Sequence, residues 1–157
     1  MNIEEEYKSL KEKYSNLPKY KDINDEFEIG ALKEERIVLL PRTILRIMLS
    51  NVSNYISMIE PAINMTSGSL HTMIEAKHIS DENKKEMFKH YKDLSKLIHE
   101  GIYAEMGDEK ETINFIIKLW KSWKELKQKQ KNYLKEIISA WSAEDDFEKQ
   151  RETGYTG

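Results

Sequence analysis

The sequence predicts an all-α protein, a single bundle of about five helices with a long C-terminal helix. Three observations lead to this fold class. The 157 residues include only six Gly and three Pro, which is typical of long helices rather than of many short strands. Apolar residues recur three or four positions apart, and no alternating strand pattern extends beyond a few residues. From 108 to 153 there is neither Gly nor Pro. We expect one domain over 1–143 and a frayed or flexible tail over 144–157.

The first helix is predicted from its N-terminal signature. Asn2 is a good N-cap, and Glu5 three positions later completes a capping box. Apolar residues then recur at helical spacing until Pro18, before which the helix should end. The next stretch, Ser15 to Gly30, mixes Pro, Asn and Asp with scattered aromatic residues. This pattern predicts an extended segment that crosses the bundle.

The most apolar region, from Leu32 to Ile59, predicts the central and most buried helix, because its apolar face is wide. Pro41 leaves two alternatives: it lies in the first turn, or it kinks a helix that begins near Lys33. Pro61 is expected to end this helix. A short helix is predicted from Ser69 to Lys77.

Two longer helices complete the prediction. Ser80 caps the first of them and Gly107 ends it, and Asp108 then caps the last helix. The last helix has a heptad seam at Ile116, Leu119, Trp123, Leu126, Gln130, Tyr133, Ile137 and Ala140. The wholly polar run from Lys127 to Asn132 places Gln130 in that seam, so we expect the helix to project, bend or break there.

Composition excludes several classes of protein. There is no Cys, which rules out disulfides, Cys-ligated zinc, iron–sulfur clusters and thiol catalysis. No apolar run approaches the roughly 18 residues of a membrane span, and the acidic start is unlike a secretory signal. We therefore expect a cytoplasmic protein without membrane association. The net charge of −3 conceals a basic segment, because residues 118–135 hold seven Lys against one acid.

The last helix carries the candidate binding surface, a stripe of lysines beside tryptophan rings. The residues are Lys121, Lys124, Lys127, Lys131, Lys135, Trp120, Trp123 and Trp141. Ammonium groups neutralise phosphates and aromatic rings stack on bases, which points to RNA or a ribosome as partner. A pI near 5.9 and only four Arg argue against it. The alternative is that the lysines are a solvated face and the tryptophans are core.

The tryptophans also suggest a surface for another protein. Trp120, Trp123 and Trp141 span about five turns, or about 30 Å, which is more aromatic surface than a small bundle needs. An exposed stripe of this kind would bind a protein partner or a second copy of the chain, forming a homodimer. The equally weighted alternative is that all three rings are buried within the chain.

A weak metal-site candidate consists of His71, Glu75 and His78, which share one helix face. Glu75 and His78 match the Glu-x-x-His element of di-iron bundles, but a second such element is missing. The favoured alternative is that His78 interacts with the dipole at a helix C-terminus and that His71 is a surface or core histidine. The sequence has no glycine-rich phosphate loop, and Ser95, His99 and Asp93, close together on one helix, do not make a catalytic triad. We therefore predict no catalytic residue and no cofactor, with a metal-dependent enzyme as a distant third function.

Some segments are similar to small helical proteins of archaea. They are Leu17-Pro18-Lys19-Tyr20 through Phe27-Glu28-Ile29, the apolar helix after Glu35, and Trp120 to Leu126. The resemblance implies an intracellular helical bundle, with no known activity and no functional residue to carry over. The sequence thus predicts a non-catalytic intracellular interaction module, self-associating through its last helix or binding a partner protein, with an RNA- or ribosome-associated protein as the alternative.

Overall fold

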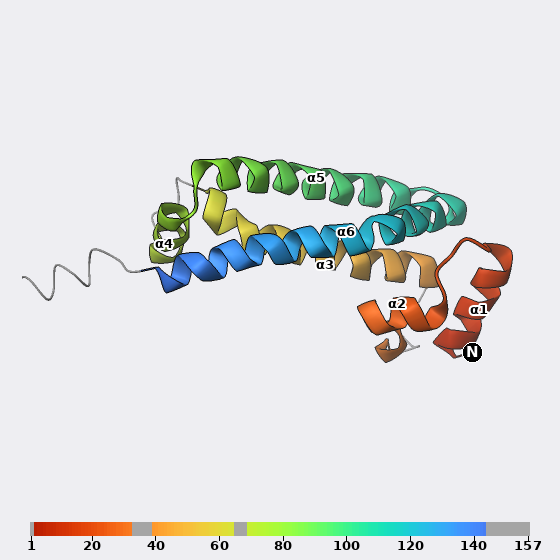
Figure 1. The fold of residues 1–157 in the computed structure, drawn as a ribbon. Coiled ribbons are helices and arrows are strands. Elements are labelled where there is room, and N and C mark those ends of the chain that lie inside the picture. Colours follow the sequence, from red (N-terminus) through yellow and green to blue (C-terminus); the bar gives the residue numbers. More distant parts are fainter. Residues whose placement is uncertain (1, 33–38, 65–68, 144–157) are drawn as a thin grey trace, which may run out of the picture.

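The computed structural model describes residues 2–32, 39–64 and 69–143, and within these ranges the chain is all helical (Figure 1). Its α-helices are α1 (Ile3–Lys13), α2 (Tyr20–Phe27), α3 (Leu40–Ile63), α4 (Leu70–His78), α5 (Asp81–Met106) and α6 (Glu109–Ser142), with a short 3₁₀ helix η1 (Ile29–Ala31) after α2. The expected fold class is confirmed. The predicted tail over 144–157 lies outside the described residues.

Three long helices form the body of the molecule. Helices α3 and α6 run in the same direction and α5 runs against both, so that α5 and α6 form a helical hairpin (Figure 1). Helix α4 lies across one end of this body, and α1 and α2 lie at the other end. The core fills the space between α3, α5 and α6, where Met48, Leu94 and Ile116 are fully buried.

Helix boundaries follow the predicted caps. Asn2 and Glu5 form a capping box on α1, and Asp108 and Glu111 form another on α6. Ser69 and Ser80 accept hydrogen bonds from backbone N–H groups in the first turns of α4 and α5, at 3.2 Å each. These contacts satisfy donors that have no partner within a helix.

Pro41 lies in the first turn of α3, which settles the alternative left open by the sequence. Residues 33–38, where the kinked alternative would begin, lie outside the described residues. The expectation that Pro61 ends the helix is wrong, because α3 continues to Ile63. Pro61 removes one backbone donor, and beyond it the Asn64 N–H still donates to the carbonyl of Glu60 at 2.9 Å.

The predicted extended segment between Ser15 and Gly30 is also wrong, since it contains α2 and η1. Ile23 and Phe27 are buried, four positions apart on one side of α2. The helix ends at Glu28, whose φ of 52° is left-handed, and the Gly30 N–H then donates to Asn24 Oδ1 at 2.6 Å. This side-chain contact stabilises the turn in place of a C-terminal glycine.

The N-terminal helices are tied to the body by buried and surface contacts. The Tyr7 hydroxyl is buried and donates to the Pro18 carbonyl at 3.0 Å, which fixes α1 against the start of α2. Glu109, in the first turn of α6, accepts from Lys13 at 2.7 Å and from the Tyr14 hydroxyl at 2.9 Å. These hydrogen bonds lower the pKa of Glu109 below its ordinary value.

Candidate functional site

All five predicted lysines of α6 lie on one side of the helix with their side chains exposed, and we call this surface the lysine face. It consists of Lys121, Lys124, Lys127, Lys131 and Lys135. Consecutive members are three or four positions apart, or about 4.5–6 Å along the axis. The structure therefore brings together the whole predicted stripe.

One lysine of this face is anchored. The Nζ of Lys127 lies 2.6 Å and 2.8 Å from the two carboxylate oxygens of Glu26 on α2. This hydrogen-bonded pair raises the pKa of Lys127 above its ordinary value. The other four lysines form no ion pair within the described part of the chain. Their positive charge faces solvent.

The tryptophans do not form the exposed stripe that the sequence allowed. Trp123 is only 4% exposed: its ring stacks on Tyr55 with centroids 5.5 Å apart, and Phe27 lies 4.8 Å away on another side. Trp120 is half-buried, with its ring 6.2 Å from Phe27. Trp123 is therefore a core residue, and this corrects its assignment to a binding surface.

The tryptophan Trp141 near the end of α6 behaves differently. It is 47% exposed, and its Nε1 donates to Glu75 Oε1 at 2.8 Å. The bond connects the last turns of α6 to α4. Glu75 is 2% exposed, so this carboxylate is packed beneath the tryptophan rather than presented to solvent.

Two members of the weak metal candidate, Glu75 and His78, lie on α4 among the described residues. No group of three His, Cys, Asp or Glu able to hold a metal ion occurs among those residues. Glu75 is engaged by Trp141, and His78 is half-buried at the end of α4. The side chain of His71 lies outside the described residues.

The polar run from Lys127 to Asn132 does not break α6, which continues through it as one helix to Ser142. Gln130 is 1% exposed, and its Nε2 donates to the Tyr55 carbonyl of α3 at 3.1 Å. A side chain with both donor and acceptor can thus occupy a seam position when a neighbouring helix supplies a carbonyl.

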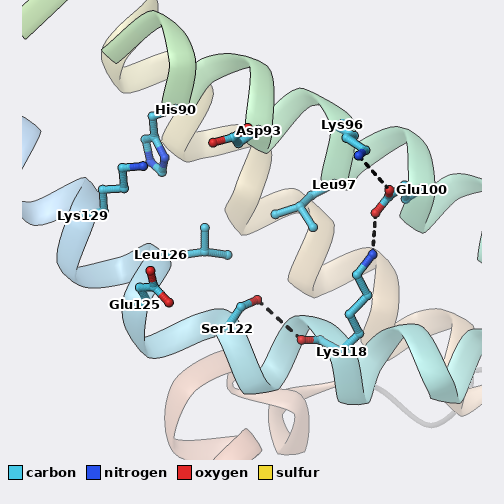
Figure 2. A pocket seen from close by; sticks show the side chains of 10 residues that line it. All are labelled: His90, Asp93, Lys96, Leu97, Glu100, Lys118, Ser122, Glu125, Leu126 and Lys129. Carbon is cyan, nitrogen blue, oxygen red and sulfur yellow. Dashed lines mark hydrogen bonds and ion pairs between the residues drawn. The ribbon is translucent and has the colours of Figure 1, made fainter. Parts of the chain in front are cut away.

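A cleft of about 400 Å³ lies between α5 and α6, on the other side of α6 from the lysine face (Figure 2). It is lined by His90, Asp93, Lys96, Leu97, Glu100, Lys118, Ser122, Glu125, Leu126 and Lys129. At one end of the cleft Lys118 pairs with Glu100 at 2.7 Å, and Lys96 approaches the same carboxylate at 3.8 Å. The pairing lowers the pKa of Glu100.

His90 occupies the other end of the cleft and was missed by sequence analysis. Its ring is fully buried, and neither nitrogen has a hydrogen-bond partner, although the Gln130 amide lies nearby. Burial and the charge of Lys129 lower the pKa of His90, against smaller opposing effects of Gln130 and Asp93. His90 is three residues after Met87 and four before Leu94. This helical spacing from two core residues was the feature of the sequence that could have predicted a buried His90.

Comparison of the chain with protein-family models, with curated proteins and with solved structures found no match. The resemblance to helical proteins of archaea stays a prediction. No helix in the described ranges is long and apolar enough to cross a membrane. The functional argument therefore rests on the side chains described above.

Proposed function

We propose that this protein is a non-catalytic, intracellular interaction module that binds an acidic segment of a partner protein along the lysine face of α6. The observation that carries the proposal is the set of four exposed lysines, Lys121, Lys124, Lys131 and Lys135, that have no counter-charge among the described residues. Other surface lysines are of two kinds: Lys8, Lys13 and Lys21 lie against carboxylates, whereas Lys85 and Lys89 of α5 are exposed and form no ion pair among the described residues.

The lysine face concentrates charge over a short distance. Its members repeat about every 4.5–6 Å, which is shorter than the Debye length of about 8 Å at physiological ionic strength. The four free ammonium groups consequently act together on an approaching anion. Like charges four positions apart, such as Lys131 and Lys135, cost a few tenths of a kcal/mol in a helix. The fold gains nothing from that repulsion, which favours a role in binding.

An acidic helix matches this surface in its geometry. Carboxylates at three- and four-residue spacing on a partner helix repeat at the same pitch as the lysines. The pair between Lys127 and Glu26 also shows that a helix can present a carboxylate to this face, since α2 does so at 2.6 Å. A partner helix that extends along α6 from there toward its C-terminal end would meet Lys131 and Lys135.

RNA is the second candidate, favoured by the uniform positive charge of the face. Two features weigh against it. Trp123, which would stack on a base, is buried under Phe27 and Tyr55. Arg42 and Arg46 lie on α3 rather than beside the lysines of α6; Arg42 donates to the Gly107 carbonyl, and the exposed Arg46 donates to Glu105. The burial of Trp123 also weakens the hypothesis of self-association through a tryptophan stripe, because this ring is not available to a second copy of the chain.

A binding experiment with two defined polyanions tests the proposal. Fluorescence anisotropy would compare labelled poly-L-glutamate with single-stranded poly(U) RNA, for the wild type, for K124E/K131E, and for K85E/K89E. The last variant makes the same charge change at exposed lysines of α5 and is the matched control. We expect K124E/K131E alone to lose poly-L-glutamate binding, with a strong salt dependence in the wild type.

The possible results separate the candidates. Tighter binding of poly(U) than of poly-L-glutamate, lost in K124E/K131E, would replace the protein partner by RNA. In that case log affinity should fall with log salt with a slope of roughly −3 if four lysines neutralise phosphates. Equal behaviour of the two double variants would rule out the lysine face as a binding surface. Sedimentation over a micromolar range would show self-association independently.

A further inference from the structure

The cleft between α5 and α6 contains a buried polar side chain whose hydrogen bonding is incomplete. Neither nitrogen of His90 makes a hydrogen bond of ordinary length and angle, although the Gln130 side chain is a hydrogen-bonding neighbour, and no other described side chain has two such buried atoms. A buried polar group left without a partner costs free energy that an apolar residue would avoid. The ring lines the cleft, so a molecule in the cleft would supply the missing partner.

The charges of the cleft are divided between its two ends. At one end the Glu100 carboxylate pairs with the ammonium groups of both Lys118 and Lys96, which leaves that end with one net positive charge (Figure 2). The other charged lining residues, Asp93, Glu125 and Lys129, form no ion pair within the described part of the chain. Two carboxylates and one ammonium are thus left for a ligand. Leu97 and Leu126 lie between the two ends and give the cleft an apolar middle.

We propose that this cleft binds a small zwitterion with an apolar body, of the chemical class of an apolar α-amino acid. The ligand's ammonium group faces Asp93 and Glu125, its carboxylate faces Lys129, and its apolar body packs on Leu97 and Leu126. The imidazole of His90 hydrogen-bonds the polar end of the ligand. The volume of about 400 Å³ falls in the range of small-molecule sites.

A ligand with a single charge fits this set of groups less well. A simple anion at Lys129 would approach the carboxylates of Asp93 and Glu125, and a simple amine would leave Lys129 without a counter-charge. A neutral imidazole suits a zwitterion, since it donates from one nitrogen and accepts at the other. Burial favours the neutral form of His90, because it lowers the pKa of the ring. The site does not depend on the lysine face, which lies on the other side of α6.

Three probes with the same carbon skeleton test the proposal: L-leucine, isoamylamine and 4-methylpentanoate. Binding would be followed by NMR of the His90 ring, with its signals assigned by their absence in H90Q. We expect L-leucine to shift the His90 signals saturably, and the two singly charged probes to bind at least about tenfold more weakly, since each lacks one charge-assisted contact.

Three variants locate the site. K129M and E125Q should each weaken L-leucine binding by about tenfold or more, while K124M on the lysine face should leave it unchanged. Circular dichroism and thermal unfolding would confirm that all three fold. The proposal is overturned by an absence of saturable shifts with L-leucine, by equal binding of a singly charged probe, or by equal affinities in K129M, E125Q and K124M. The results with the three probes and with the three variants do not change the results expected for polyanion binding to the lysine face.

Discussion

The two sides of α6 carry the same kind of residue in different settings. On the side that faces α5, Lys118 is paired with Glu100, and Lys129 lies close enough to His90 to lower the pKa of that ring. On the opposite side, Lys127 is paired with Glu26 of α2, and the remaining lysines face solvent. The difference shows that a lysine's role is decided by the helix opposite it, because that helix either supplies a carboxylate or does not.

The largest expected effect is a loss of stability when the packing between α2 and α6 is disturbed. W123A removes a buried ring that contacts Phe27 and Tyr55, and we expect the free energy of unfolding to fall by about 3–5 kcal/mol. The measurement is urea-induced unfolding followed by circular dichroism. L126A, which shortens a half-buried side chain on the cleft side, is the comparison and should cost less. A smaller loss for W123A than for L126A would contradict the packing described here.

The second prediction concerns the side of α6 that faces the cleft and uses the dependence of stability on pH. The folded-state pKa of His90 is lowered from the ordinary 6.5, so the folded protein binds fewer protons at this site than the unfolded chain. Its neutral ring therefore contributes stability above pH 6.5, and that contribution is lost as the pH falls below 6.5 toward the folded-state pKa. Each unit of lowering is worth about 1.4 kcal/mol when the loss is complete.

H90L should flatten this part of the pH profile. Unfolding free energies of the wild type and H90L would be measured from pH 7.5 to pH 5, and the wild type should lose stability relative to H90L toward the acidic end. The exposed His99 remains in both proteins and serves as an internal control. Parallel profiles would show that His90 is not a buried neutral histidine.

The smallest expected effect distinguishes the paired lysine from its neighbours. K127E breaks the pair with Glu26 and places two carboxylates together, which should cost about 0.2–1 kcal/mol because the pair is partly exposed. K124E reverses a charge that has no partner among the described residues and should leave stability within a few tenths of a kcal/mol. Thermal unfolding at low and high salt measures both. Equal losses in the two variants would mean that the Glu26 contact contributes nothing.

Local rules predicted the helices whose ends carry their own side-chain caps. Asn2, Ser80 and Asp108 bond to backbone donors within three residues, so the sequence alone contains the whole interaction. Helix α2 was missed because it lacks such a cap: Lys19 makes no capping bond, and the left-handed Glu28 replaces the usual glycine. Its stability depends on burying Ile23 and Phe27 against distant parts of the chain.

The candidate surfaces also divide into one that local sequence predicts and one that depends on contacts between distant residues. The lysine face was predictable because helical periodicity alone places its five residues on one side. The cleft was not, since it takes His90 and Asp93 from α5 and Glu125 and Lys129 from α6, and no local pattern relates them.

By itself, the sequence determined an all-α chain, its main caps and the direction in which the lysines of α6 point. Only the tertiary structure decided that Trp123 is core, that Gln130 finds a carbonyl on α3, and that His90 lies in a cleft. The physical reason is range: caps and periodicity act within a few residues, whereas burial depends on which helices meet, and that is fixed by the packing of the whole chain.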